Sequence, residues 1–264
     1  MVLTSTESEI HVTLLVSNGT AFMSEFMGTM ILIVLGCGVV ANNLLKGTKG
    51  EGTGFLHVNW GWGIAVMAGV YFAQPTGGHL NPAVTLGIAT KNIVAGNSSA
   101  NNWGQIMVFI VAQFLGAFVG AVLCWLAYKQ HYDTDIDPAL KLGTFSTAPA
   151  IRNPLWNTVT EVIGTFVLVG WVLIAGLMDP KGNSFIPLGV TMLIVGIGAS
   201  LGGPTGYAIN PARDLGPRIA HAVLPIKGKG GNDWGYAWVP VVGPLVGAIL
   251  AGIIIPLTYG SLVK

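Results

Sequence analysis

Two short stretches of this sequence share one pattern, TGGHLNPAV over residues 76–84 and GYAINPAR over residues 206–213. In both, a glycine-containing loop leads into Asn-Pro-Ala. Asparagine is a favoured helix N-cap, and proline is favoured at the first helical position. Each stretch therefore predicts an extended loop that enters a short helix, over about 82–90 and about 211–222.

The residues around these stretches are mostly apolar. The 264-residue chain is 52% hydrophobic and 9% charged, with a mean hydropathy of +0.67, whereas a soluble domain carries about 25% charged residues. A membrane-spanning helix needs about 20 mostly apolar residues. Six segments reach or approach this length: 21–45, 57–73, 103–128, 155–178, 185–201 and 234–259. The sequence therefore predicts an all-α membrane protein with an N-terminal tail over residues 1–20.

The two halves of the chain repeat the same order of segments. EFMGT at residues 25–29 matches EVIGT at 161–165, and each Asn-Pro-Ala follows the second candidate span of its half. The repeats cover about 21–128 and about 155–259. Three spans in each half invert the second repeat relative to the first, and inverted repeats place broken helices opposite each other near the bilayer midplane. Irregular backbone at that depth must be buried in protein or line a water-filled cavity.

Two Asn-Pro-Ala loops on an inverted repeat of three spans resemble the aquaporin family. The resemblance covers residues 21–260, nearly the whole chain, which it marks as one channel domain. It implies the aquaporin fold, with six transmembrane helices plus two re-entrant half-helices. It also implies a homotetramer in the cell membrane that conducts solutes passively and is not an enzyme.

The residues after the second Asn-Pro-Ala resemble one branch of that family. Asp214 directly follows Arg213, as in glycerol facilitators, whereas water-selective members usually carry a small residue there. Pro240 and Val241 are non-aromatic, where water-selective members tend to place aromatic residues. The resemblance implies a channel for glycerol, water and other small uncharged solutes, with a water-selective channel as the alternative.

The resemblance also places the centre of the pore. Its residues would be the two motifs themselves: Asn81, Pro82, Ala83, Asn210, Pro211 and Ala212. A carboxamide NH2 can donate to a passing hydroxyl or water. Two helix N-termini that face the pore would repel cations and break a continuous proton wire.

The selectivity filter of the family maps onto Trp62, Gly198, Tyr207 and Arg213. Alignment along the second span favours Trp62, while counting back from the first Asn-Pro-Ala leaves Trp60 as a second choice. A charged residue in the membrane marks a functional site, and Arg213 would supply several donors and a fixed positive charge. The aromatic pair would hold a polyol's carbon chain. Gly198 would leave room that histidine fills in water-selective members, and Tyr207 departs from the phenylalanine common in glycerol facilitators.

Buried polar residues near the loops allow two interpretations. Glu25 and Glu161 are intramembrane carboxylates, which serve as proton relays in pumps; the family resemblance instead implies that each braces a re-entrant loop. His79 is expected to support the first loop, because no second histidine lies at metal-ligand spacing. Gln113 is either a buried polar contact or a donor that faces the pore.

Other function classes find little support in the sequence. It contains no nucleophile–base pair, metal cluster or phosphate-binding loop, and it implies no cofactor. The net charge of +1 gives no nucleic-acid footprint. Cys37 and Cys124 lie in apolar runs and are expected to be small buried hydrophobes. A secondary transporter remains an alternative, because inverted repeats with broken helices also occur in that class.

Overall fold

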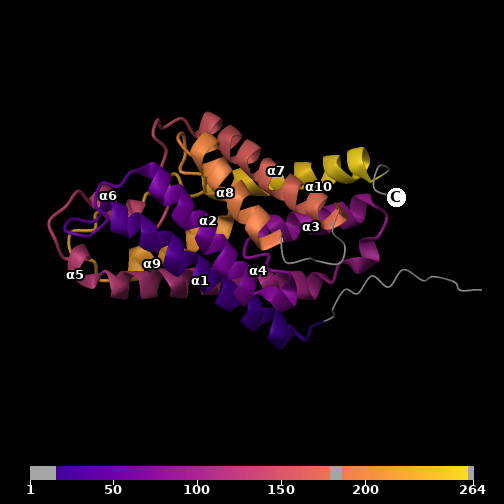
Figure 1. The fold of residues 1–264 in the computed structure, drawn as a ribbon, viewed down its shortest axis with the longest axis horizontal. Coiled ribbons are helices and arrows are strands. Elements are labelled where there is room, and N and C mark those ends of the chain that lie inside the picture. Colours follow the sequence, from indigo (N-terminus) through magenta and orange to yellow (C-terminus); the bar gives the residue numbers. More distant parts are fainter. Residues whose placement is uncertain (1–15, 179–185, 261–264) are drawn as a thin grey trace, which may run out of the picture.

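The computed structural model describes residues 16–178 and 186–260, and every regular element in these residues is helical (Figure 1). Six of the helices are long: α1 (Asn18–Leu44), α2 (Phe55–Phe72), α4 (Trp103–Ala127), α7 (Pro154–Met178), α8 (Ile186–Leu201) and α10 (Val239–Tyr259). They correspond to the six predicted spans. The proposed tail over residues 1–20 falls mostly outside the described residues, so its limits stay a prediction.

The remaining helices are short. They are η1 (Gln74–Thr76), α3 (Pro82–Val94), η2 (Ser98–Ala100), α5 (Lys129–Tyr132), α6 (Pro138–Gly143) and α9 (Pro211–Val223). The two half-helices predicted after the Asn-Pro-Ala motifs are α3 and α9, and each has 13 residues. Because each residue adds 1.5 Å to a helix, neither can cross a bilayer.

Helix ends follow local capping. The first long helix begins three residues before the predicted position, because the Ser17 side chain accepts from the Thr20 backbone N–H at 3.1 Å and caps it. The last long helix begins at Val239, five residues later than predicted, after a stretch of turns over 234–238.

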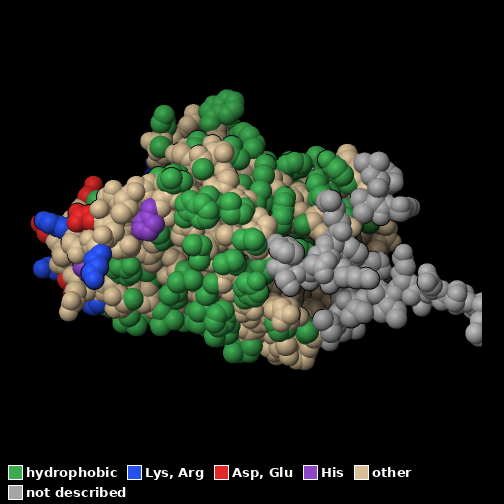
Figure 2. All heavy atoms as spheres, viewed as in Figure 1, with side chains coloured by type: hydrophobic (Ala, Val, Ile, Leu, Met, Phe, Trp, Pro, Cys, Tyr) green, Lys and Arg blue, Asp and Glu red, His purple; other side chains and the backbone are tan. Residues whose placement is uncertain are grey.

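The outer surface suits a lipid environment. Helices α1, α4, α7 and α10 are long and apolar enough to cross a membrane, while α2 and α8 are shorter, with 18 and 16 described residues. In Figure 2, hydrophobic side chains cover the middle of the visible face, and charged side chains gather at the end that carries α5 and α6. We refer to that end as the filter end.

The helix contacts reproduce the inverted repeat. Helix α1 packs on α4 in the first half, as α7 packs on α10 in the second. Each half-helix then packs against the last long helix of the other half, α3 on α10 and α9 on α4, while α2 and α8 meet across the two halves. The half-helices therefore lie between the repeats, α3 directed toward the chain termini and α9 toward the filter end (Figure 1).

Glycines allow the long helices to cross closely. A Cβ at Gly116 of α4 would lie 2.3 Å from the Phe26 carbonyl oxygen of α1. A Cβ at Gly247 of α10 would lie 2.3 Å from the Val162 carbonyl oxygen of α7. Since small residues let helix backbones approach within membranes, these equivalent contacts fix how each half is assembled.

Candidate pore and selectivity filter

The two Asn-Pro-Ala asparagines connect the half-helices at the centre of the molecule. Each caps its own helix: Asn81 Oδ1 accepts from the Ala83 N–H at 2.8 Å, and Asn210 Oδ1 accepts from the Ala212 N–H at 3.0 Å. Each Nδ2 then donates across the repeat, Asn81 to the Ile209 carbonyl at 2.8 Å and Asn210 to the Leu80 carbonyl at 2.9 Å. Because a carboxamide carries two N–H bonds, each Nδ2 has a second N–H beyond this contact.

The backbone before each asparagine is strained. Leu80 and Ile209 have φ angles of 56° and 42°, in the left-handed region that non-glycine residues seldom adopt. Such a conformation costs about 1–3 kcal/mol per residue and persists only where surrounding contacts hold it. The required contacts come from two buried carboxylates.

Glu25 and Glu161 supply these contacts from equivalent places on α1 and α7. Glu161 accepts from the backbone N–H groups of Ala208 at 3.0 Å and Ile209 at 2.7 Å. Glu25 accepts from the N–H groups of His79 at 3.0 Å and Leu80 at 2.7 Å. Each carboxylate thus fixes the two residues that precede its asparagine.

The first loop has further polar support. His79 Nδ1 lies 3.0 Å from Thr85 Oγ1, and its ring packs on Phe109. Gln113 is fully buried, and its Nε2 donates to Glu25 Oε2 at 2.8 Å and to Thr85 Oγ1 at 3.1 Å. Of the two possibilities left open by the sequence, Gln113 is therefore a buried polar contact. The described residues contain no cluster of three or more metal-ligating side chains.

A cavity of about 680 Å³ follows the two loops through the molecule. Its polar lining comes from the loop backbone and from the side chains of His79, Asn81, Lys91, Asn210 and Arg213. Its apolar side comes from the long helices and from α3: Leu32, Val66, Val70, Val84, Ile88, Leu168, Val172, Leu173, Val190 and Ile194. A cavity lined by both polar and apolar groups can hold a small solute that has hydroxyl groups along a carbon chain.

The structure places Trp62, Tyr207 and Arg213 together on this cavity. The Arg213 guanidinium lies 3.8 Å from the centroid of the Trp62 ring, a cation–π contact. Its Nη1 also donates to the Phe145 carbonyl at 3.4 Å. Trp62 is 4% exposed, whereas Trp60 is 44% exposed and does not line the cavity. The geometry therefore favours Trp62 over Trp60 beside Arg213.

The surroundings of Gly198 are not the open space that the sequence predicted. A Cβ at this position would lie 2.6 Å from Asn59 Oδ1 and 2.8 Å from Tyr207 Cζ. The room that glycine provides is therefore already filled by the Tyr207 ring, which packs against α8, and Gly198 itself is absent from the cavity lining. The absence of a Cβ at Gly198 allows the Tyr207 ring to pack against α8.

Comparison with known proteins agrees with this architecture. The family model described as Major intrinsic protein matches residues 14–255, almost the whole chain. The chain belongs to the major intrinsic protein family. It is therefore a multi-pass membrane protein with the aquaporin fold.

The relatives of this major intrinsic protein include bacterial glycerol uptake facilitator proteins. It is 48% identical over 234 residues to the glycerol uptake facilitator protein of Streptococcus pneumoniae. The alignment covers 88% of this chain and 97% of that relative. It is 49% identical over 235 residues to the glycerol uptake facilitator protein of Bacillus subtilis, at 89% and 83% coverage. The aquaglyceroporin structure from Plasmodium falciparum superposes with a TM-score of 0.77 and 30% identity, covering 94% of this chain and 99% of that one.

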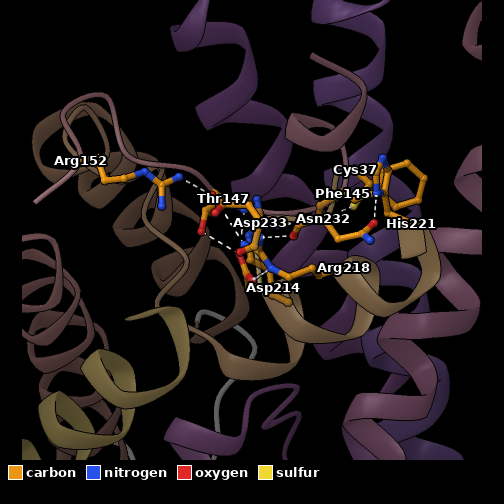
Figure 3. A network of polar contacts seen from close by, with 10 residues as sticks. Cys37, Phe145, Thr147, Arg152, Asp214, Arg218, His221, Asn232 and Asp233 are labelled. Atoms are coloured by element: carbon orange, nitrogen blue, oxygen red, sulfur yellow. Dashed lines mark hydrogen bonds and ion pairs between the residues drawn. The ribbon is translucent and has the colours of Figure 1, made fainter. Parts of the chain in front are cut away.

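Asp214 of this major intrinsic protein does not line the cavity. It is fully buried behind the filter, where its Oδ2 accepts from the Thr147 N–H and Oγ1 at 2.7 Å each. Its Oδ1 accepts from Arg218 Nε at 2.8 Å (Figure 3). The residue singled out as a branch marker is thus the centre of a buried polar network.

Some residues at the filter were missed by reasoning from the sequence. Phe145 and Thr147 lie in a connecting segment with no recognisable motif, and only the fold brings them to Arg213 and Asp214. Arg218 could have been found, because it follows Asp214 by four residues on a helix, the spacing of an ion pair.

Proposed function

We propose that this protein is a passive channel for glycerol and other small uncharged solutes, with water, and that it excludes ions and protons. The observation that carries the proposal is the two-sided filter. Trp62 and Tyr207 supply aromatic surface for a carbon chain, and Arg213 supplies donors for hydroxyl groups beside them. The relatives named glycerol uptake facilitators support the same solute class.

Exclusion of cations follows from the positive charges that border the cavity. Asn81 and Asn210 cap helices whose positive ends face the centre of the passage. Arg213 adds a fixed positive charge at the narrow aromatic section. In a low-dielectric site these charges repel cations strongly. The N–H donors of the asparagines would orient water so that a proton wire breaks.

In this proposal the buried carboxylates are structural. The carboxylates of Glu25 and Glu161 accept hydrogen bonds from the backbone of the two loops. His79 supports the first loop through Thr85. This assignment favours a channel over an ion-coupled secondary transporter, because Glu25 and Glu161 are buried, are occupied by loop contacts and do not line the cavity.

The protein would act as a homotetramer in the cell membrane, without a cofactor and without catalysis. The glycerol uptake facilitators among its relatives support that location. Lipid would contact exposed apolar side chains such as Met107, Leu115 and Ile163. Glycerol and water would be its transported partners.

A solute panel in proteoliposomes tests the proposal. Purified protein would be reconstituted, and stopped-flow swelling would be recorded for water, glycerol, urea, dihydroxyacetone and undissociated lactic acid. We expect glycerol flux well above that of empty liposomes, with no dependence on sodium or proton gradients. Water flux without glycerol flux would favour a water-selective channel, and ion-dependent flux would favour a transporter.

A further inference from the structure

A buried arginine on α9, Arg218, takes no part in lining the passage. Its Nε donates to Asp214 Oδ1 at 2.8 Å and its Nη2 to Asp214 Oδ2 at 3.2 Å, and both side chains are fully buried. Removing two charges from water is costly, and such pairs often add no net stability. A gain in stability alone therefore explains the presence of this pair poorly, whereas its position in the fold offers another explanation.

The same guanidinium joins α9 to two connecting segments at the filter end (Figure 3). Its Nη2 donates to the Thr147 carbonyl at 3.0 Å. Its Nη1 donates to the carbonyls of Asn232 at 2.9 Å and Asp233 at 3.2 Å. The planar fork of arginine can reach a carboxylate and several carbonyls at once, which the single ammonium of lysine cannot do.

These contacts lead directly to the filter. Thr147 is held through its carbonyl by Arg218 and through its N–H and hydroxyl by Asp214. Two residues earlier, the Phe145 carbonyl accepts from Arg213 Nη1, which is the one hydrogen bond found for that guanidinium among residues 16–178 and 186–260. The direction in which Arg213 points therefore depends on where Thr147 holds this segment.

We propose that Arg218 is a positioning residue for the filter. Through Asp214 and Thr147 it keeps the Phe145 carbonyl where Arg213 donates to it, and so keeps the charge barrier in the passage. This inference rests on the proposed function, in which Arg213 rejects ions. It assigns the Asp214–Arg218 pair to selectivity and leaves solute contact to the filter residues.

The test compares two arginines that both contact the segment over residues 232–233. Arg218→Gln removes the buried charge and most of the fork, and Arg218→Lys keeps the charge alone. Arg152→Gln is the matched control, because Arg152 pairs with the Asp233 side chain but is 53% exposed. Should Arg218→Gln fail to fold, the double variant Asp214→Asn with Arg218→Gln removes both charges together, so that neither is left unpaired.

Two readouts separate positioning from general stability. The first is proton and potassium leak into proteoliposomes, measured beside glycerol and water flux. The second is the rate at which Cys37 reacts with a small methanethiosulfonate in a Cys124→Ser background. Cys37 is 1% exposed, and its Sγ donates to the same Phe145 carbonyl at 3.8 Å, so it reports movement of that segment independently of transport.

We expect Arg218→Gln to raise both ion leak and the Cys37 reaction rate about tenfold, the scale of losing one hydrogen bond to a charged group. For Arg218→Lys, the ion leak and the Cys37 reaction rate should lie between those of Arg218→Gln and those of the native protein. Both values for Arg152→Gln should match the native protein. Native ion exclusion and native thiol reactivity in folded Arg218→Gln would overturn the proposal. The proposal would also be overturned if Arg218→Gln lowered the glycerol and water fluxes in proportion while ion leak and the Cys37 reaction rate stayed at native values. If the native protein carries no glycerol, the proposed function fails, while the Cys37 rates still decide whether Arg218 positions the segment.

Discussion

Replacing Gly198 by alanine should selectively impair glycerol transport. The added methyl group would stand 2.8 Å from Tyr207 Cζ and 2.6 Å from Asn59 Oδ1, both closer than Cβ atoms come in proteins. The Tyr207 ring must retreat by about 0.6 Å to reach an ordinary contact of 3.4 Å. Because this ring lines the cavity, its retreat from α8 narrows the filter.

The size of the effect follows from overpacking. Inserting a methyl group into a well-packed site costs about 1–3 kcal/mol. If this cost falls on glycerol in the filter, glycerol flux drops about 5- to 150-fold. Water needs less of the width and carries no carbon chain, so its flux should fall much less. The expected signature is a lower ratio of glycerol to water permeability.

The assay is stopped-flow light scattering of proteoliposomes at matched protein content. Gly196→Ala is the control, because a Cβ at that position on the same helix meets no atom within 4 Å. Gly196→Ala should behave as the native protein does. An unchanged glycerol-to-water ratio in folded Gly198→Ala would show that Tyr207 does not set the width of the filter, and the reasoning about Gly198 would be refuted.

Substitutions at three further positions test other parts of the site. Arg213→Val should admit protons or potassium while neutral solutes still pass, as read by a pH-sensitive dye in the liposomes; intact exclusion would contradict its role as the charge barrier. Glu161→Leu leaves the N–H groups of Ala208 and Ile209 unpaired, at about 1–3 kcal/mol each, so folded yield should collapse, whereas Glu161→Gln keeps an acceptor and part of the flux; a Leu variant with normal yield and flux would argue against bracing. Tyr207→Phe removes a buried hydroxyl that has no hydrogen-bond partner within residues 16–178 and 186–260. The free energy of unfolding should therefore stay the same or rise by up to about 1 kcal/mol, and a clear loss would mean that the hydroxyl is paired in the membrane.

The sequence predicted the fold well because membrane chains have few ways to satisfy their backbone. Six apolar segments and two Asn-Pro motifs required spanning helices and half-helices. The repeated Glu and Asn-Pro-Ala then fixed which helices correspond between the halves. The short helices α5 and α6 were not predicted, since polar connections carry no apolar periodicity that marks them.

The site was predictable only where residues lie on elements of known register. Trp62, Tyr207 and Arg213 lie on or next to such elements, and they meet on the cavity. The space beside Gly198 could not be judged, because it depends on how the Tyr207 ring is seated. Phe145 acts through a backbone carbonyl, which the amino-acid type does not reveal.

The most direct test of the central claim is the concentration dependence of glycerol flux into proteoliposomes, recorded together with proton leak. A passive channel predicts fast glycerol entry that rises in proportion to the gradient, ignores added sodium or proton gradients, and leaves proton leak at the level of empty liposomes. Water-only flux, or glycerol flux that saturates and follows an ion gradient, would contradict the assignment as a passive glycerol channel.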